Sequence, residues 1–258
     1  MQHAARDRLE RQVAWLASND CADILVLSEV GGGDRCRHLL HLLEAAGYLA
    51  VHSDNIEAAF LVVIAFRHCA ITEPPSALQH CPRLVRTFAR TRGGELEIVG
   101  LYVPSRGPTG QRNVAKRAFQ NEVTHMLPAI VDSARRAGRE LIIAGDLNVV
   151  EPGHIPHHRV FGTWEHEFYT AFLTVGRLSD AFRTMNGAEV DHSWFGQRSG
   201  LGYRIDHLFV SAGLGVDECS YDRGPRLAGL SDHAALCAHL HFRSREGRRG
   251  GQGPMALP

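Results

Sequence analysis

Short apolar runs alternate with segments of helical period along most of this sequence. The helical period recurs over residues 4–18, 36–46, 113–137 and 164–175. Extended apolar runs occupy residues 23–29, 48–52, 59–66, 84–90, 96–103, 141–144, 203–210 and 234–242. Strands mixed with a few long helices in a chain of 258 residues predict a single α/β domain. In the longest helix we expect five residues to face the core: Val114, Phe119, Val123, Leu127 and Ile130.

The end of the chain departs from this pattern. From Ser244 onward Arg and Gly are prominent and no apolar period remains. A segment of that composition cannot bury enough apolar surface to become ordered. We therefore expect residues 1–243 to form the domain and residues 244–258 to be a disordered tail.

The charge balance limits the classes of function. Lys and Arg together number 28, as do Asp and Glu, so the formal net charge is zero. A protein that coats nucleic acid without selectivity carries a basic excess, whereas an enzyme needs only a local basic surface. Almost all of the basic charge is arginine, with Lys116 the only lysine, and a GC-rich genome explains this bias more simply than phosphate binding does.

The cysteines and the absence of targeting segments indicate a cellular location. Six cysteines are scattered without a Cys-x-x-Cys pair, which is typical of buried thiols in a reducing compartment rather than of disulfides or a structural zinc site. No secretory leader opens the sequence and no apolar run reaches membrane-spanning length. We expect a cytoplasmic protein that acts as a monomer.

Carboxylates and amides stand where the apolar runs end. Glu29 ends one run, Asp146 and Asn148 follow another, and Asp206 lies within a third. The pair Asp232 and His233 comes directly before the last run. A carboxylate beside a core strand costs free energy unless it is paired or binds a cation. The recurrence of such residues predicts one polar site at the end of a sheet.

The residue types of this site indicate its chemistry. Hard oxygen ligands without cysteine or paired histidine suit Mg²⁺ or Mn²⁺ better than Zn²⁺. Such an ion polarises a phosphoryl oxygen, and a histidine beside a carboxylate can stabilise the transition state or transfer a proton. The pattern favours metal-dependent hydrolysis of phosphate esters.

Five short motifs carry a family resemblance. Ala22–Glu29, Gly100–Pro104, Gly145–Asn148, Arg204–Asp206 and Ser231–His233 occur in an order and spacing similar to those of the endonuclease/exonuclease/phosphatase superfamily. Within it, the segments at 102–107, 176–183 and 193–195 most resemble exonuclease III and the abasic-site endonucleases. The resemblance implies a four-layer α/β/β/α sandwich. It also implies a metal-dependent DNA nuclease of DNA repair that acts at abasic sites or 3′ ends.

The same resemblance implies roles for the residues of the motifs. Glu29 would be the principal metal ligand, with Asp232 nearby. Asp146 would orient or deprotonate the attacking water. His233, oriented by Asp206, would stabilise the transition state.

The resemblance also implies a set of substrate contacts. Asn148 would hold the attacking water or a phosphate oxygen, and Tyr102 would contact the phosphate. Ser105 and Arg106 would bind the substrate, and Trp194 would line the pocket for the abasic sugar. DNA is therefore the expected partner.

Each assignment has a structural alternative. Glu29 and Asp146 could be turn residues, since Asp favours turns beside Gly. Asp206 could be an ion-pair partner of Arg204 or Arg226.

The histidines and aromatic residues also have structural alternatives. His154, His157 and His158 could form a transition-metal site, but a solvated loop over residues 151–162 is the simpler interpretation. For the pair Trp194 and Phe195, core packing is the alternative to a substrate pocket.

The sequence also departs from the family. The family's first strand, which ends in an Asn of the metal shell, has no counterpart, because the sequence begins almost at the first helix. We expect that strand upstream of the recorded start, with replacement by another segment or an inactive relative as alternatives. Ser105 stands where Asn is common, the Asn expected before Arg204 is not there, and the loop at 195–203 is shorter than in the abasic-site enzymes.

These departures leave three functions open. The first is a DNA nuclease that acts at abasic sites or 3′ ends with Mg²⁺ or Mn²⁺. The second is a phosphatase or phosphodiesterase for a small phosphorylated substrate, which the neutral net charge also suits. The third is a binding module that keeps the fold without turnover.

Overall fold

The computed structural model describes residues 6–18, 22–71, 81–107 and 110–244. The segment before α1, on which the expectation of a missing strand rests, lies outside these residues, as does the tail at 245–258. Within the described part of the chain, no helix combines the length and apolar character needed to cross a bilayer.

Helices and strands alternate as the apolar pattern predicts. The helices are α1 (Arg6–Ser18), α2 (Asp34–Ala45), α3 (Gly110–Ala137), α4 (Thr163–Thr174), α5 (Ala181–Asn186) and α6 (Gly224–Leu227). The first seven strands are β1 (Ile24–Gly31), β2 (Leu49–His52), β3 (Phe60–Phe66), β4 (Ala70–Ile71), β5 (Leu84–Arg90), β6 (Glu95–Tyr102) and β7 (Glu140–Asp146). The others are β8 (Ser179–Asp180), β9 (Trp194–Phe195), β10 (Gly202–Tyr203), β11 (Asp206–Val210), β12 (Leu214–Asp222) and β13 (Ala235–Phe242).

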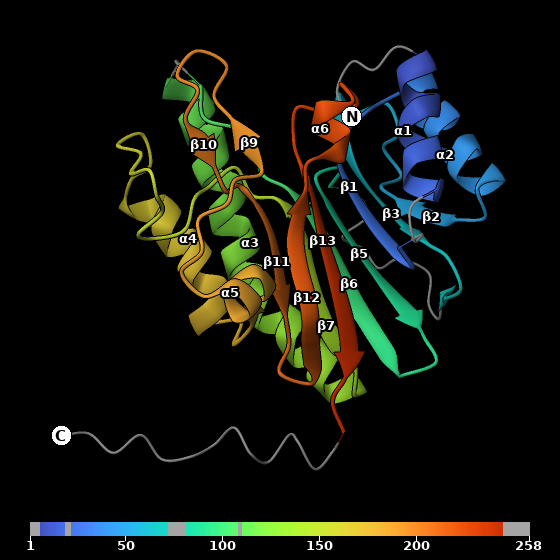
Figure 1. Cartoon of the computed structure of the whole chain (residues 1–258). Coiled ribbons are helices and arrows are strands. Elements are labelled where there is room, and N and C mark those ends of the chain that lie inside the picture. The colour runs from blue at the N-terminus through green and yellow to red at the C-terminus, as the bar shows by residue number, and fades with distance from the viewer. Residues whose placement is uncertain (1–5, 19–21, 72–80, 108–109, 245–258) are drawn as a thin grey trace.

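Two sheet layers pack face to face (Figure 1). One is a six-stranded sheet in the order β4-β5-β6-β7-β11-β8, in which β6 and β7 run parallel. The other layer consists of two separate pieces, the antiparallel sheet β1-β3-β2 and the pair β12-β13. The core between the layers includes Val62, Ile64, Ile98 and Ile142. Gly100 permits the close approach, because a Cβ there would lie 2.6 Å from Val62 Cγ1.

Helices cover the outer faces of both layers (Figure 1). On one side, α1 and α2 bury Leu9 and Leu39 with the outer face of β1 and β3. On the other, α3 and α4 bury Leu127 and Phe172 against β6, β7 and β11. This arrangement confirms the α/β/β/α layering.

Two predictions about single elements are wrong. The strand expected over residues 203–210 is interrupted at Arg204 and Ile205, because their backbone N–H groups donate to His154 Nε2 and Ser193 Oγ instead of a neighbouring strand. Asp206 therefore begins a strand rather than lying inside one. In α3, Val114 is 70% exposed and does not face the core.

The expectation of buried thiols holds for only part of the cysteine set. Cys36 and Cys219 are buried, Cys69 and Cys81 are half-buried, and Cys237 is exposed on β13. All five of these described cysteines are free thiols.

Candidate active site

Glu29 is turned out of its strand by a bulge. The pairing of β1 with β3 shifts between Leu27 and Val30, and Glu29 takes a φ of 53°. This backbone, unusual for a residue other than glycine, directs the carboxylate to the hydroxyl of Tyr102, which donates a hydrogen bond to Glu29 Oε1. Burial and the Glu29 carboxylate raise the pKa of Tyr102, so this hydroxyl keeps its proton at neutral pH.

Asp146 and Asn148 form a tight polar turn at the end of β7. The backbone N–H of Asn148 donates to Asp146 Oδ1 over 2.8 Å, and its Nδ2 donates to Asp146 Oδ2 over 2.9 Å. Asn148 has a φ of 49°, a conformation that asparagine tolerates. Gly145 is required here, since a Cβ at its φ of 141° would lie 2.0 Å from the carbonyl oxygen of Leu101.

The neighbouring strands bring two further residues to this turn. Tyr102 on β6 and Asp206 on β11 both pair with Asp146 in register. His233, just before β13, places its Nδ1 2.7 Å from Asp206 Oδ2. Asp206 therefore pairs with His233 and not with Arg204 or Arg226, the alternatives considered from the sequence.

The neighbouring charges shift the pKa values of Asp146, Asp206 and His233 in different directions. Burial and the Asp206 carboxylate raise the pKa of Asp146 well above its ordinary value. Burial would raise the pKa of Asp206, but the charge and hydrogen bond of His233 outweigh it and lower that pKa. Burial would lower the pKa of His233, but the Asp206 carboxylate outweighs burial and raises it to about 10. The imidazole is accordingly a cation at neutral pH.

Of the remaining predicted residues, Trp194 and Asp232 contact each other beside His233, whereas Arg106 is held by Glu165. Trp194 on β9 donates from Nε1 to Asp232 Oδ2 over 3.0 Å, and its ring lies 6.4 Å from that of His233. Phe195 is 40% exposed, so core packing does not explain its position, whereas Trp194 is half-buried. Ser105 is exposed, whereas Arg106 is bound to the buried Glu165 through its Nε at 3.1 Å.

Three supporting residues had no predicted role: Lys116, Glu165 and Ser193. Lys116 is fully buried in α3, where its Nζ donates to Glu165 and, over 2.7 Å, to the carbonyl of Asn148. Ser193 Oγ accepts from the N–H groups of Ile205 and Asp206. In the sequence, the only feature that could have marked Lys116 as important is that it is the sole lysine of the chain.

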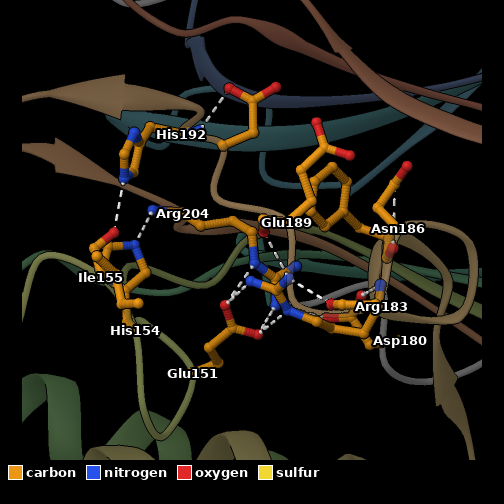
Figure 2. Close-up of polar contacts among 12 residues, drawn as sticks. Glu151, His154, Ile155, Asp180, Arg183, Asn186, Glu189, His192 and Arg204 are labelled. Carbon is orange, nitrogen blue, oxygen red and sulfur yellow. Dashed lines mark hydrogen bonds and ion pairs between the residues drawn. The ribbon is translucent and has the colours of Figure 1, made fainter.

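A buried ion network supports the strand that carries Asp206 (Figure 2). Arg204 is fully buried and donates to Asp180 Oδ2 over 2.9 Å and from its Nε to Glu151 Oε1 over 3.1 Å. Arg183 binds the same Glu151 carboxylate at 2.7 Å. Burial would raise the pKa of Glu151, but these two arginines outweigh it and lower the pKa to about 2.

The histidine-rich loop is solvated only in part, with His157 exposed. His154 and His158 are buried, so a solvated loop is wrong for them. Their rings are engaged by backbone groups: His154 Nε2 accepts from the N–H of Arg204 over 3.0 Å, and His158 Nε2 lies 2.9 Å from the carbonyl of Gly202. Across the described ranges, the one group of metal-binding side chains with ligand atoms within 4.8 Å of one another is Asp146, Asp206 and His233.

The burial of His154 gives a prediction for acid stability. Burial lowers its pKa to about 4, whereas an unfolded histidine titrates near 6.5. The unfolded chain therefore binds the proton first, and the free energy of unfolding should fall by on the order of 3 kcal/mol as pH drops from about 6.5 to 4. Urea titrations over this range would measure it. A His154→Gln variant should show a flatter pH dependence, and an equally steep one would contradict the assignment.

Solved structures with the same architecture come from enzymes that act on DNA. An AP endonuclease from Archaeoglobus fulgidus superposes with a TM-score of 0.73 at 24% identity, covering 93% of this chain and 95% of that one. A 3′ phosphatase from Neisseria, bound to a product DNA hairpin, gives 0.72 at 23% identity, with 90% and 94% covered. An AP endonuclease from Leishmania major gives 0.72 at 19% identity, with 93% and 86% covered.

The chain has the AP endonuclease fold. The fold implied by the motif resemblance is thus confirmed over nearly the whole chain. Neither a protein-family model nor a curated protein matches the chain by sequence. Within the AP endonuclease fold, the polar residues Glu29, Tyr102, Asp146, Asp206 and His233 lie near strand ends or in the loops beside them.

Proposed function

We propose that this protein is a divalent-metal-dependent phosphodiester hydrolase that acts on DNA at abasic sites or 3′ ends. The observation that carries the proposal is the juxtaposition of a buried, basic Asp146 with the Asp206–His233 ion pair. A base and a cation within one small site are the two groups that in-line attack of water on phosphorus requires.

Asp146 would take the proton of the attacking water. Its raised pKa makes it a stronger base than an exposed carboxylate, and the amide of Asn148 beside it can orient the water. The oxygen of the water then bonds to phosphorus while the bond to the leaving oxygen breaks. The imidazolium of His233 would offset the negative charge that grows on the phosphoryl oxygens.

Glu29 and Asp232 are the residues we propose as ligands of the metal. Both line the same groove as Asp146 and offer carboxylate oxygens, the ligands that suit Mg²⁺ or Mn²⁺. One oxygen of Glu29 accepts a hydrogen bond from Tyr102, and one oxygen of Asp232 accepts a hydrogen bond from Trp194. The second oxygen of each carboxylate can face a cation. His233 is a poor ligand because it carries a proton. The bound ion would supply Lewis-acid polarisation of the phosphoryl group.

Features around the site support DNA as the substrate. Trp194 stands beside Asp232 with Phe195 exposed next to it, and Arg226 lies 4.5 Å from the Phe195 ring. Aromatic side chains next to arginine are suited to stacking on bases or sugars exposed in DNA. The solved structures of similar fold come from AP endonucleases and a 3′ phosphatase, which supports the same substrate class.

A small phosphate ester is the second candidate substrate, and the zero net charge favours it. The test is hydrolysis with Mg²⁺ of a labelled duplex containing one abasic-site analogue, of a duplex with a 3′ phosphate, and of p-nitrophenyl phosphate. We expect turnover of a duplex substrate, and a large excess of the small ester should inhibit that turnover only weakly. Preferred turnover of the small ester would establish the second candidate, and duplex binding without turnover would indicate a binding module.

A further inference from the structure

Lys116 is a buried cation next to the candidate active site, and the proposed reaction does not use it. Its side chain is 0% exposed and extends from α3, which packs against α4 on the outer face of the six-stranded sheet (Figure 1). Burying an ammonium group costs free energy unless other groups compensate its donors and its charge. The partners of Lys116 therefore indicate what the residue does.

The Lys116 ammonium is enclosed by polar and aromatic groups. Nζ donates to the carbonyl of Asn148 over 2.7 Å and to Oε1 of Glu165. It also lies 5.3 Å from the ring centroid of Phe161 and 5.7 Å from that of Trp164, within the range of cation–π contacts. These contacts leave the ammonium little freedom to move.

Glu165 holds the ammonium from the first turn of α4. The carboxylate is fully buried and accepts from the backbone N–H of Gly162 over 2.9 Å and from Nε of Arg106 over 3.1 Å. Burial lowers the pKa of Lys116, and the negative charge of Glu165 opposes that shift. Because two other groups already donate to this carboxylate, the distinctive contact of Lys116 is the one with the Asn148 carbonyl.

The Asn148 carbonyl belongs to a turn with an unfavourable backbone. A φ of 49° persists in a residue other than glycine only where the surrounding contacts hold it. The N–H and Nδ2 of Asn148 bind the two oxygens of Asp146, and Nδ2 also donates to the carbonyl of Val103 over 2.9 Å. Lys116 holds the carbonyl of the same residue. If that carbonyl were released, the peptide could rotate and the bonds to Asp146 would loosen.

We propose that Lys116 is a positioning residue of the hydrolase. By holding the Asn148 carbonyl, it keeps the Asn148 amide and the Asp146 carboxylate in the orientation that directs the attacking water. The effect on rate rests on the proposed function, whereas the effect on the turn does not. A compact ammonium fits an enclosed space better than a planar guanidinium, which agrees with the position of the chain's only lysine.

Lys116→Met tests the proposal, since it keeps most of the side-chain length but removes the charge and the donors. The backbone amide of Asn148 should exchange with solvent at least about tenfold faster, because its hydrogen bond to Asp146 loosens. With a DNA duplex, kcat should fall about 10²-fold, the loss expected for a small misplacement, while KM changes by less than about threefold. Hydrogen exchange followed by NMR and steady-state kinetics would measure these effects.

Gln120→Met is the matched control. Gln120 is buried on α3 one helical turn after Lys116, and neither of its side-chain polar atoms has a hydrogen-bond partner among the described residues. Its replacement removes a buried polar group from the same helix without touching the turn. We expect the exchange of the Asn148 amide and kcat to stay as in the wild type.

The double variant Lys116→Met/Glu165→Gln separates positioning from stability. Lys116→Met alone leaves a buried carboxylate less compensated, so the thermal midpoint should fall. Removing both charges costs less than removing one, and the thermal midpoint should recover toward the wild-type value. The rate and the Asn148 exchange should stay as in the single variant, because the carbonyl still lacks its donor.

Three outcomes would overturn the proposal. The first is unchanged exchange of the Asn148 amide in Lys116→Met. The second is a rate that recovers together with the thermal midpoint in the double variant, and the third is an equal loss of rate in Gln120→Met. If the wild-type protein hydrolyses no substrate, the proposed function fails, and the exchange of the Asn148 amide still decides whether Lys116 holds the turn.

Discussion

Replacing Asp206 by Asn should lower the rate of phosphodiester cleavage by about 10²- to 10⁴-fold while leaving the fold intact. The carboxylate holds the pKa of His233 near 10 through a 2.7 Å hydrogen bond. Without that negative charge the pKa of His233 falls, and less of the imidazole is positively charged at neutral pH. The alkaline limb of the pH–rate profile should therefore move to lower pH. Single-turnover rates between pH 6 and 10 would measure both effects.

His233→Gln is the matched partner of that variant. If the two residues act as one unit, the double variant Asp206→Asn/His233→Gln should be little slower than the slower single variant. Losses that multiply would mean that the two side chains act independently. A structural role alone is excluded if circular dichroism and the thermal midpoint change little while the rate falls.

Replacing Arg204 by Met should have the largest effect on stability, a loss of about 3–5 kcal/mol in the free energy of unfolding. Arg204 is fully buried and bridges the buried carboxylates of Glu151 and Asp180. Removing it leaves both negative charges with less compensation in a region of low dielectric constant. Equilibrium urea denaturation at pH 7 would measure the loss.

Arg183→Met is the control for this effect. Arg183 also binds Glu151, but its side chain is 28% exposed, so water can partly replace it. Its loss should cost clearly less than the loss of Arg204. Equal costs would contradict the view that burial, rather than the number of ion pairs, determines the contribution of each arginine.

Local pattern was sufficient to predict much of the fold and the position of the candidate site. Strands of Val, Ile and Leu that carry Glu29 near one end or finish at Asp146 can be recognised from a few neighbouring residues. The break before Asp206 could not be predicted in this way. It depends on hydrogen bonds from the backbone of residues 204–206 to side chains 12 to 50 residues away, those of His154 and Ser193.

The supporting groups were missed because their partners are distant in sequence. Glu151 lies 53 residues from Arg204, and Lys116 lies 49 residues from Glu165. Such pairs look like ordinary surface charges until the fold brings them together. β12 was missed for another reason, since its exposed polar residues and the register shift between Val216 and Glu218 obscure the alternation of a strand.

The central claim is tested most directly by incision of a duplex oligonucleotide that carries one abasic-site analogue. The reaction is run with Mg²⁺, with EDTA, and with Asp146→Asn, which keeps the shape of the buried side chain but removes its basicity. We expect incision at the analogue that disappears with EDTA and falls by at least about 10³-fold in the variant. Incision that persists in EDTA or in Asp146→Asn, or no incision by the folded protein with Mg²⁺, would contradict the proposed nuclease.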